Sequence, residues 1–151
     1  MRWLMIVLIA SIGTAQACLA QGPVHFTFTA QKMAPQKYTL HIVATINEGW
    51  HIYSQSQPKG AISQPVLIKC ASNPLINIPK GDWKEIGQKE MHMTPQLGVV
   101  QYQYSGQVEF VKYVTLKATV KTSVSGTLIY QTCTDERCLN PTDVPFTIAL
   151  Q

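Results

Sequence analysis

Two cysteines near the C-terminus have the residue type and the spacing that thiol–disulfide chemistry requires. Cys133 and Cys138 are separated by the four residues Thr-Asp-Glu-Arg, between the apolar residues 128–130 and Pro141. A hairpin-like loop of this size can bring two Cα atoms within the ~4.4–6.8 Å that a disulfide needs. The pair can therefore close a local disulfide.

Two roles are open for such a disulfide. As a structural staple it would stabilise little, because loop-closure entropy assigns ~3 kcal/mol to a fifteen-residue loop and less to a shorter one. A short, polar, exposed loop also admits an attacking thiolate, and exposed disulfides are the labile ones. From the spacing alone, a redox pair and a staple stay equally open.

The surroundings of the pair do not decide between these roles. Arg137 favours a thiolate at Cys138, whereas the neighbouring Asp135 and Glu136 oppose it. Cys70 alternates in step with the apolar side chains of residues 66–70, so we expect a buried, inert thiol there. The expected covalent structure is one disulfide, Cys133 to Cys138, with Cys70 free.

The N-terminus predicts export. Residues 1–20 combine a positively charged start, an apolar run over residues 3–12 and small residues near the end, which is the pattern of a secretory signal peptide. The run is shorter than the ~20 apolar residues of a membrane-spanning helix. We expect a periplasmic protein, in a compartment where disulfides persist.

Cys18 leaves open a lipid tether after cleavage of the signal peptide. Ala15 stands three residues before it, where a lipoprotein signal usually has leucine, and one lipid chain without a polybasic patch anchors weakly. The untethered form is therefore the expectation, with anchoring through Cys18 as the alternative.

Residues 21–151 have the length of one domain with a core of its own. Period-two alternation of apolar and polar residues dominates this part, and Gly, Pro and Asn mark the breaks. The pattern predicts an all-β, immunoglobulin-like antiparallel sandwich of about eight strands. The alternating runs are residues 24–29, 38–46, 50–53, 66–70, 99–104, 108–120, 125–132 and 144–150.

The longest stretch without a strand pattern covers residues 83–98, and we expect it to be an irregular lid. Within it, Met91, His92 and Met93 carry the thioether and imidazole groups that bind Cu(I). In an extended segment the two methionines share one face and His92 opposes them, so they cannot chelate together without a turn. We therefore predict no metal site, and a partly apolar loop that covers a partner surface.

Charge and histidine positions exclude other classes of function. The net charge of +4 is spread along the chain, so neither nucleic acid nor an anionic membrane is an expected partner. The histidines stand alone at positions 25, 41, 51 and 92, without a Ser-His-Asp or paired-carboxylate arrangement. Hydrolytic catalysis has no support, and no small-molecule cofactor is expected.

Residues 130–146, which contain both cysteines, resemble the N-terminal periplasmic domain of the DsbD family of thiol:disulfide interchange proteins. Residues 48–53, Glu-Gly-Trp-His-Ile-Tyr, are similar to that domain's Gly-aromatic-x-x-Tyr segment, and residues 81–83, Gly-Asp-Trp, precede the position of its cap loop. The three segments keep the family's order along the chain.

The resemblance implies an immunoglobulin-like domain whose cysteines take electrons from a membrane-embedded electron-transfer protein through a thioredoxin-like domain. They would pass them to thioredoxin-like periplasmic proteins, on a route that also serves cytochrome c biogenesis. By the same resemblance, Cys138 forms mixed disulfides with partners and Cys133 resolves them. The alternative function is a non-enzymatic periplasmic binding module with a structural disulfide.

The family also suggests which side chains surround the sulfurs. His51 and Tyr53 fall where family members place aromatic side chains beside the site, and Glu85, Ile86, Gly87 and Gln88 fall at the cap. Three departures stand out: one residue fewer between the cysteines than in the best-known members, no aromatic in the cap, and an end at Gln151 without membrane helices. We therefore expect either a free-standing domain that receives electrons in trans or a fragment of a larger system.

Overall fold

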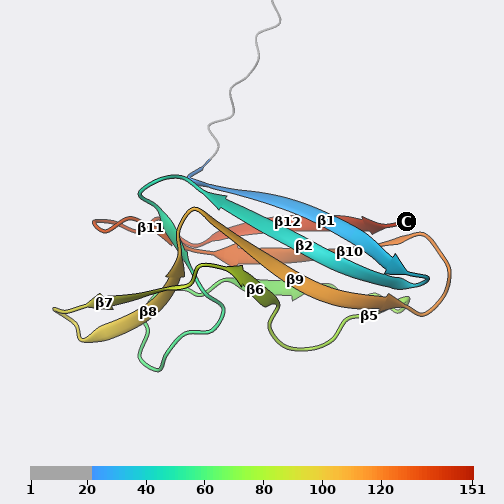
Figure 1. Cartoon of the computed structure of the whole chain (residues 1–151), viewed down its shortest axis with the longest axis horizontal. Coiled ribbons are helices and arrows are strands. Elements are labelled where there is room, and N and C mark those ends of the chain that lie inside the picture. Colours follow the sequence, from blue (N-terminus) through green and yellow to red (C-terminus); the bar gives the residue numbers. More distant parts are fainter. Residues whose placement is uncertain (1–21) are drawn as a thin grey trace, which may run out of the picture.

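A computed structural model describes residues 22–151 of the chain. The predicted signal peptide and Cys18 lie outside the described residues. The described part is built from strands that are joined by turns and loops (Figure 1). The strands are β1 (Val24–Ala34), β2 (Lys37–Ile46), β3 (His51–Tyr53), β4 (Leu67–Cys70), β5 (Ile76–Asn77), β6 (Lys84–Gly87), β7 (Glu90–Thr94), β8 (Val99–Tyr104), β9 (Gln107–Leu116), β10 (Thr122–Tyr130), β11 (Thr132–Cys133) and β12 (Thr142–Leu150).

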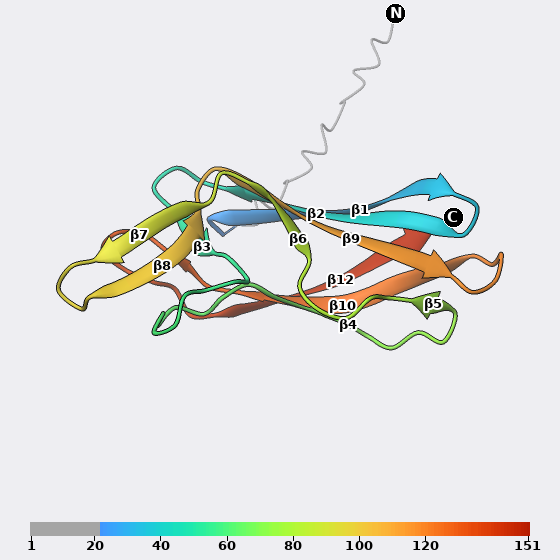
Figure 2. The ribbon, with the colours of Figure 1, turned by 60° about the horizontal axis from the view of Figure 1, so that its bottom comes forward.

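The strands form three antiparallel sheets. In the largest sheet the order is β1-β2-β9, and both β5 and β6 pair with β9. The second sheet has the order β12-β10-β4 and lies beneath the first as the other layer of the sandwich (Figure 2). The third sheet, β11-β3-β8-β7, extends from one end of the two layers. This end sheet carries Cys133.

The core lies between the two main layers and follows the alternation of the sequence. In β2, for example, the buried side chains of Leu40, Ile42 and Ala44 alternate with His41 and Val43, which keep part of their surface exposed. Fully burying one such aliphatic side chain stabilises a fold by about 1.5–3 kcal/mol. The two long layers therefore form a firm support for the small end sheet.

The immunoglobulin-like antiparallel β-sandwich predicted from the sequence is confirmed, and each of the eight alternating runs contains a strand. The prediction that residues 83–98 are irregular is wrong. This stretch contains β6, which pairs with β9, and β7, which forms a hairpin with β8. Short strands contain too few residues to show a clear period-two signal, and the two-residue strands β5 and β11 were missed for the same reason.

Candidate redox site

The two cysteines face each other across a tight hairpin that begins at the end of β11. Cys133 and Cys138 form a bridge pair, flanked by hydrogen bonds from the amide of Leu139 to the carbonyl of Thr132, at 3.0 Å, and from the amide of Thr134 to the carbonyl of Arg137, at 2.8 Å. The two cysteines are thus the non-hydrogen-bonded pair of the hairpin, the arrangement in which opposite side chains lie closest.

The side chain of Thr134 holds the turn between the cysteines. Its Oγ1 accepts hydrogen bonds from the amides of Glu136, at 3.2 Å, and Arg137, at 3.1 Å. Threonine and serine hydroxyls commonly cap turns in this way. The short loop between the cysteines is therefore held by hydrogen bonds of its own.

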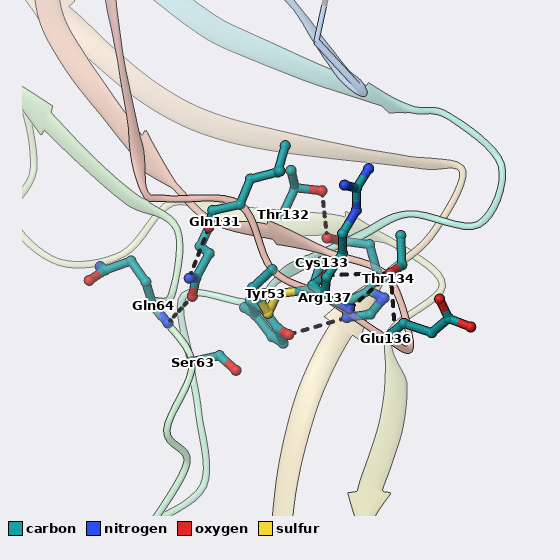
Figure 3. The surroundings of a disulfide bond; sticks show 12 residues. Tyr53, Ser63, Gln64, Gln131, Thr132, Cys133, Thr134, Glu136 and Arg137 are labelled. Atoms are coloured by element: carbon teal, nitrogen blue, oxygen red, sulfur yellow. Dashed lines mark hydrogen bonds between the residues drawn. A yellow bond between two sulfur atoms is a disulfide. The ribbon is translucent and has the colours of Figure 1, made fainter.

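The disulfide joins Cys133 and Cys138, whose Cα atoms are 4.0 Å apart, and Cys70 is free (Figure 3). The predicted pairing is confirmed for the described cysteines. The partly exposed Cys70 lies on β4, and burial raises the pKa of its thiol, while Lys112 has the smaller opposite effect. Cys70 is thus neither buried completely nor activated.

The two sulfur-bearing residues differ strongly in their access to solvent. Cys133 is only 1% exposed, whereas Cys138 is an exposed residue of the loop. A partner protein can therefore reach Cys138 but not Cys133. This difference was not readable from the sequence, because it depends on which arm of the hairpin joins the end sheet.

Strand β3 places His51 beside Cys133. Cys133 in β11 is the direct antiparallel partner of His51, and the neighbouring Thr132 donates a hydrogen bond of 2.9 Å from its Oγ1 to the backbone carbonyl of His51. Directly opposite residues of antiparallel strands project to the same face of a sheet. His51, Cys133 and Cys138 therefore form one row across β3, β11 and the returning arm of the hairpin.

His51 and Tyr53 form a buried pair on this face. The Nε2 atom of His51 lies 3.2 Å from the Tyr53 hydroxyl, and the two rings meet edge to face. Burial lowers the pKa of His51; Asp135 and Glu90 oppose this shift and His92 adds to it. Burial raises the pKa of Tyr53. Both side chains are therefore neutral at pH 7.

The same face continues over β8 and β7. Gln103 is the direct partner of Tyr53 and of Glu90, and it donates a hydrogen bond of 3.3 Å from its Nε2 to Glu90. His92 pairs with the buried Gln101 one step further along the hairpin. The place of these four residues at the site was not predicted from the sequence, because it depends on the strand order of the end sheet.

Glu85, predicted as part of the cap, is a structural centre in the fold. Its carboxylate accepts hydrogen bonds of 2.7 Å from Ser54 Oγ, 2.7 Å from the Gln55 amide and 2.8 Å from the Tyr104 hydroxyl, and Lys89 Nζ lies 3.0 Å away. Burial works to raise the pKa of Glu85, but these donors together lower it. The charged carboxylate ties β6 to β8 and to the segment after β3.

The other predicted cap residues lie beside Glu85. Ile86 is exposed on β6, Gly87 packs closely on the backbone of β9, and Gln88 is exposed between β6 and β7. None of the hydrogen bonds of the described residues joins this group to the loop between the cysteines. That residues 85–88 cap the sulfurs stays a prediction.

The Met-His-Met segment lies on β7 in extended form. Met91 and Met93 pair with Tyr102 and Val100 on one face, and His92 lies on the other. The two methionines are exposed. Over residues 22–151 we find no group of three His, Cys, Asp or Glu side chains placed to hold a metal ion. The same residues contain no helix with the length and hydropathy for crossing a membrane.

A comparison with protein families identifies the chain. Residues 15–149 match the family described as "Thiol:disulfide interchange protein DsbD, N-terminal". The chain belongs to this family. The match includes both cysteines, His51 and Tyr53, and the whole end sheet. No curated protein sequence matches the chain closely enough to be called a relative.

Several solved structures are similar. The reduced DsbD N-terminal domain of Neisseria meningitidis is 18% identical with a TM-score of 0.48, over 83% of this chain and 85% of that one. The N-terminal periplasmic domain of ScsB from Proteus mirabilis is 19% identical with a TM-score of 0.46, over 82% and 44%. A DsbD N-terminal domain from Neisseria meningitidis in complex with the PilB N-terminal domain is 16% identical with a TM-score of 0.47, over 81% and 80%.

Proposed function

We propose that this chain is a periplasmic thiol–disulfide exchange domain that relays electrons through the Cys133–Cys138 pair. It accepts them from a membrane electron-transfer protein by way of a thioredoxin-like donor and passes them to disulfides of thioredoxin-like periplasmic proteins. Membership of the DsbD N-terminal family supports the reaction class. The unequal exposure of the two cysteines supports the division of labour.

The reaction takes two exchange steps. In the reduced domain the thiolate of the exposed Cys138 attacks a sulfur of the partner's disulfide, so that a Cys138–partner disulfide forms and the other partner sulfur leaves as a thiolate. Cys133 then attacks Cys138, the intramolecular disulfide forms, and the second partner sulfur leaves with its electron pair. Two electrons pass to the partner, and the donor reduces the pair by the reverse steps.

The geometry of the site suits these steps. The first step needs one sulfur that a large partner can reach, which Cys138 provides from the turn. The second needs a thiol that waits near Cys138 without reacting with solvent species, which the 1% exposure of Cys133 provides. His51 and Tyr53 border the resolving sulfur and belong to the proposed site.

Trapping tests the assignment of roles. Reduced Cys133→Ala protein, mixed with an oxidised thioredoxin-like protein, should accumulate a mixed disulfide through Cys138, because no resolving thiol is left. Of the pair, the matched Cys138→Ala variant keeps only the buried Cys133 thiol, and it should trap at least about tenfold less through that residue. Non-reducing electrophoresis and peptide mapping measure both. Equal trapping by the two variants would remove the basis for separate roles.

A redox titration separates the proposed relay from a structural staple. The folded, oxidised protein is equilibrated with glutathione buffers, and the fraction of the Cys133–Cys138 disulfide is measured after acid quenching and alkylation. A relay pair should be reduced within the range of thioredoxin-level reductants while near-UV circular dichroism stays native. A pair that resists until the protein unfolds would support a binding module with a structural disulfide, and the relay proposal would fail.

A further inference from the structure

The exchange reaction needs an acceptor for one proton. Cys133 must lose its thiol proton before it attacks Cys138, yet at 1% exposure it has little contact with water. Burial also disfavours the charged thiolate. A buried resolving thiol therefore calls for a neighbouring base that takes the proton as the sulfur–sulfur bond forms.

We propose that His51 is this base: its imidazole takes the proton of Cys133 when Cys133 attacks Cys138, and the Tyr53 hydroxyl positions the ring. The inference rests on the proposed exchange function and adds a role to it. It stands on the row of His51, Cys133 and Cys138 across adjacent strands, and on the contact of 3.2 Å between His51 Nε2 and the Tyr53 hydroxyl.

Position and protonation state both fit this role. His51 is a direct cross-strand partner of Cys133, and Cβ atoms of such pairs lie about 4.5–5.5 Å apart. Burial lowers the pKa of His51, so the imidazole is neutral and ready to accept a proton at pH 7. The charged or titratable groups that act on it are Asp135 from the cysteine loop and His92 and Glu90 from β7, with Tyr53 in contact.

The other titratable side chains near Cys133 are less suited than His51 to take its proton. Burial raises the pKa of Tyr53, so its hydroxyl keeps its proton and cannot take the proton of Cys133. Glu90 is occupied by hydrogen bonds from Gln103, at 3.3 Å, and from Ser105 Oγ, at 3.2 Å. Asp135 lies in the exposed turn next to Thr134. Among the described residues only His51 combines an acceptor nitrogen with a place opposite Cys133.

The proton of Cys133 moves to His51 while one disulfide bond forms and another breaks. The Sγ–H bond of Cys133 breaks while an N–H bond forms on the imidazole of His51. The electron pair of the Cys133 sulfur forms the bond to Cys138, and the bond between Cys138 and the partner sulfur breaks. The partner leaves as a thiolate and takes up the proton from the imidazolium, directly or through water. In the reverse direction the imidazolium protonates the leaving Cys133.

The test follows the second step alone. Reduced protein in a Cys70→Ala background is mixed with excess oxidised glutathione, quenched with acid at short times, and analysed by mass spectrometry for the Cys138–glutathione adduct and for its conversion to the intramolecular disulfide. The parent protein should convert the adduct at a rate that changes little between pH 6.5 and 8.5. With His51→Gln, conversion should slow about 10²-fold at pH 7 and rise about tenfold per pH unit, because hydroxide must then remove the proton.

Controls separate a chemical role of His51 from a structural one. Formation of the adduct should keep its rate in His51→Gln, because Cys138 is exposed. His25→Gln, at an exposed position of β1, should match the parent protein. Tyr53→Phe keeps the buried ring but removes the hydroxyl, so conversion should slow several-fold and keep its flat pH profile. If near-UV circular dichroism shows that His51→Gln does not fold, Tyr53→Phe tests the proposal in its place.

Each outcome has one meaning. The same conversion rate and pH profile in His51→Gln as in the parent would overturn the role of His51 while leaving the exchange function intact. If His51→Gln does not fold, an unchanged rate in Tyr53→Phe overturns the positioning of the ring. A parent protein that forms neither the glutathione adduct nor the intramolecular disulfide overturns the exchange function itself.

Discussion

The guanidinium carbon of Arg137 lies 5.5 Å from the centre of the Trp50 ring, so the turn between the cysteines is held to the segment that enters β3. Trp50 directly precedes His51, the cross-strand partner of Cys133. The contact therefore joins the exposed side of the disulfide to the strand that lies beside its buried side. An exposed cation–π contact of this kind contributes about 0.5–1 kcal/mol.

Removing this contact should loosen the turn without unfolding the domain. In Arg137→Gln we expect hydrogen exchange of the Thr134 amide, which donates to the Arg137 carbonyl, to become about two- to fivefold faster, as the loss of 0.5–1 kcal/mol implies. Exchange measured by NMR on the oxidised protein checks this. Glu136→Gln, in the same turn and without a side-chain hydrogen bond or ion pair among those described, is the control. Equal hydrogen exchange in the parent protein and both variants would show that the contact between Arg137 and Trp50 does not hold the turn.

The three described cysteines should react with iodoacetamide in a fixed order. In the reduced, folded protein we expect Cys138 to be alkylated first and Cys133 and Cys70 at least about tenfold more slowly. Cys138 is exposed and Cys133 is buried, and the thiol of the half-buried Cys70 has a pKa that burial raises. Peptide mapping at successive times measures the order. Early labelling of Cys133 would show that reduction opens the end sheet and would weaken the assigned roles.

Much of the fold was readable because the long strands repeat a simple pattern. The alternation of residues 38–46 predicted a half-buried strand, and β2 occupies that place with Leu40 and Ile42 in the core. The local spacing of Cys133 and Cys138 likewise predicted their disulfide, because a loop of four residues keeps the two cysteines close together. These features depend on neighbours in the sequence.

The rest depends on strand order, which a single sequence does not reveal. Gln103 and Glu90 reach the cysteine face only because β3 pairs with β8 and β8 with β7. The prediction that residues 83–98 are irregular failed for the same reason. Residues 84–87 form a strand that pairs with β9, and Glu85 accepts hydrogen bonds from Ser54 and Tyr104, which are distant in sequence.

Gly126 should be intolerant of any side chain, because the sandwich closes tightly around it. A Cβ atom at this position would lie 2.3 Å from the Lys69 carbonyl oxygen and 2.7 Å from the ring of Phe146. Overpacking of this kind costs about 1–3 kcal/mol. We expect Gly126→Ala to lower the free energy of unfolding in urea by at least that amount, while Gly22→Ala, with open space around it, leaves it unchanged. A neutral Gly126→Ala would mean that β4 and β12 move apart easily.

Glu85→Gln should destabilise the domain in a pH-dependent way. The hydrogen bonds from Ser54, Gln55 and Tyr104 lower the pKa of Glu85 in the folded state, so the folded protein holds the charged form more strongly than the unfolded chain does. That contribution is complete above the ordinary glutamate pKa of about 4.3 and is lost as the pH falls through the lower pKa of the folded state. A glutamine turns an NH₂ group toward donors that need an acceptor.

We therefore expect Glu85→Gln to lower the free energy of unfolding by about 1–3 kcal/mol at pH 7, and by clearly less in acid below the folded-state pKa, where the native carboxyl is also protonated. Urea unfolding at both pH values measures the two differences. Glu48→Gln changes the same charge at an exposed turn and should have little effect at either pH. An equal loss of stability at both pH values would show that Glu85 acts through its shape rather than its charge, because only the charged form gains from donors that converge on both oxygens.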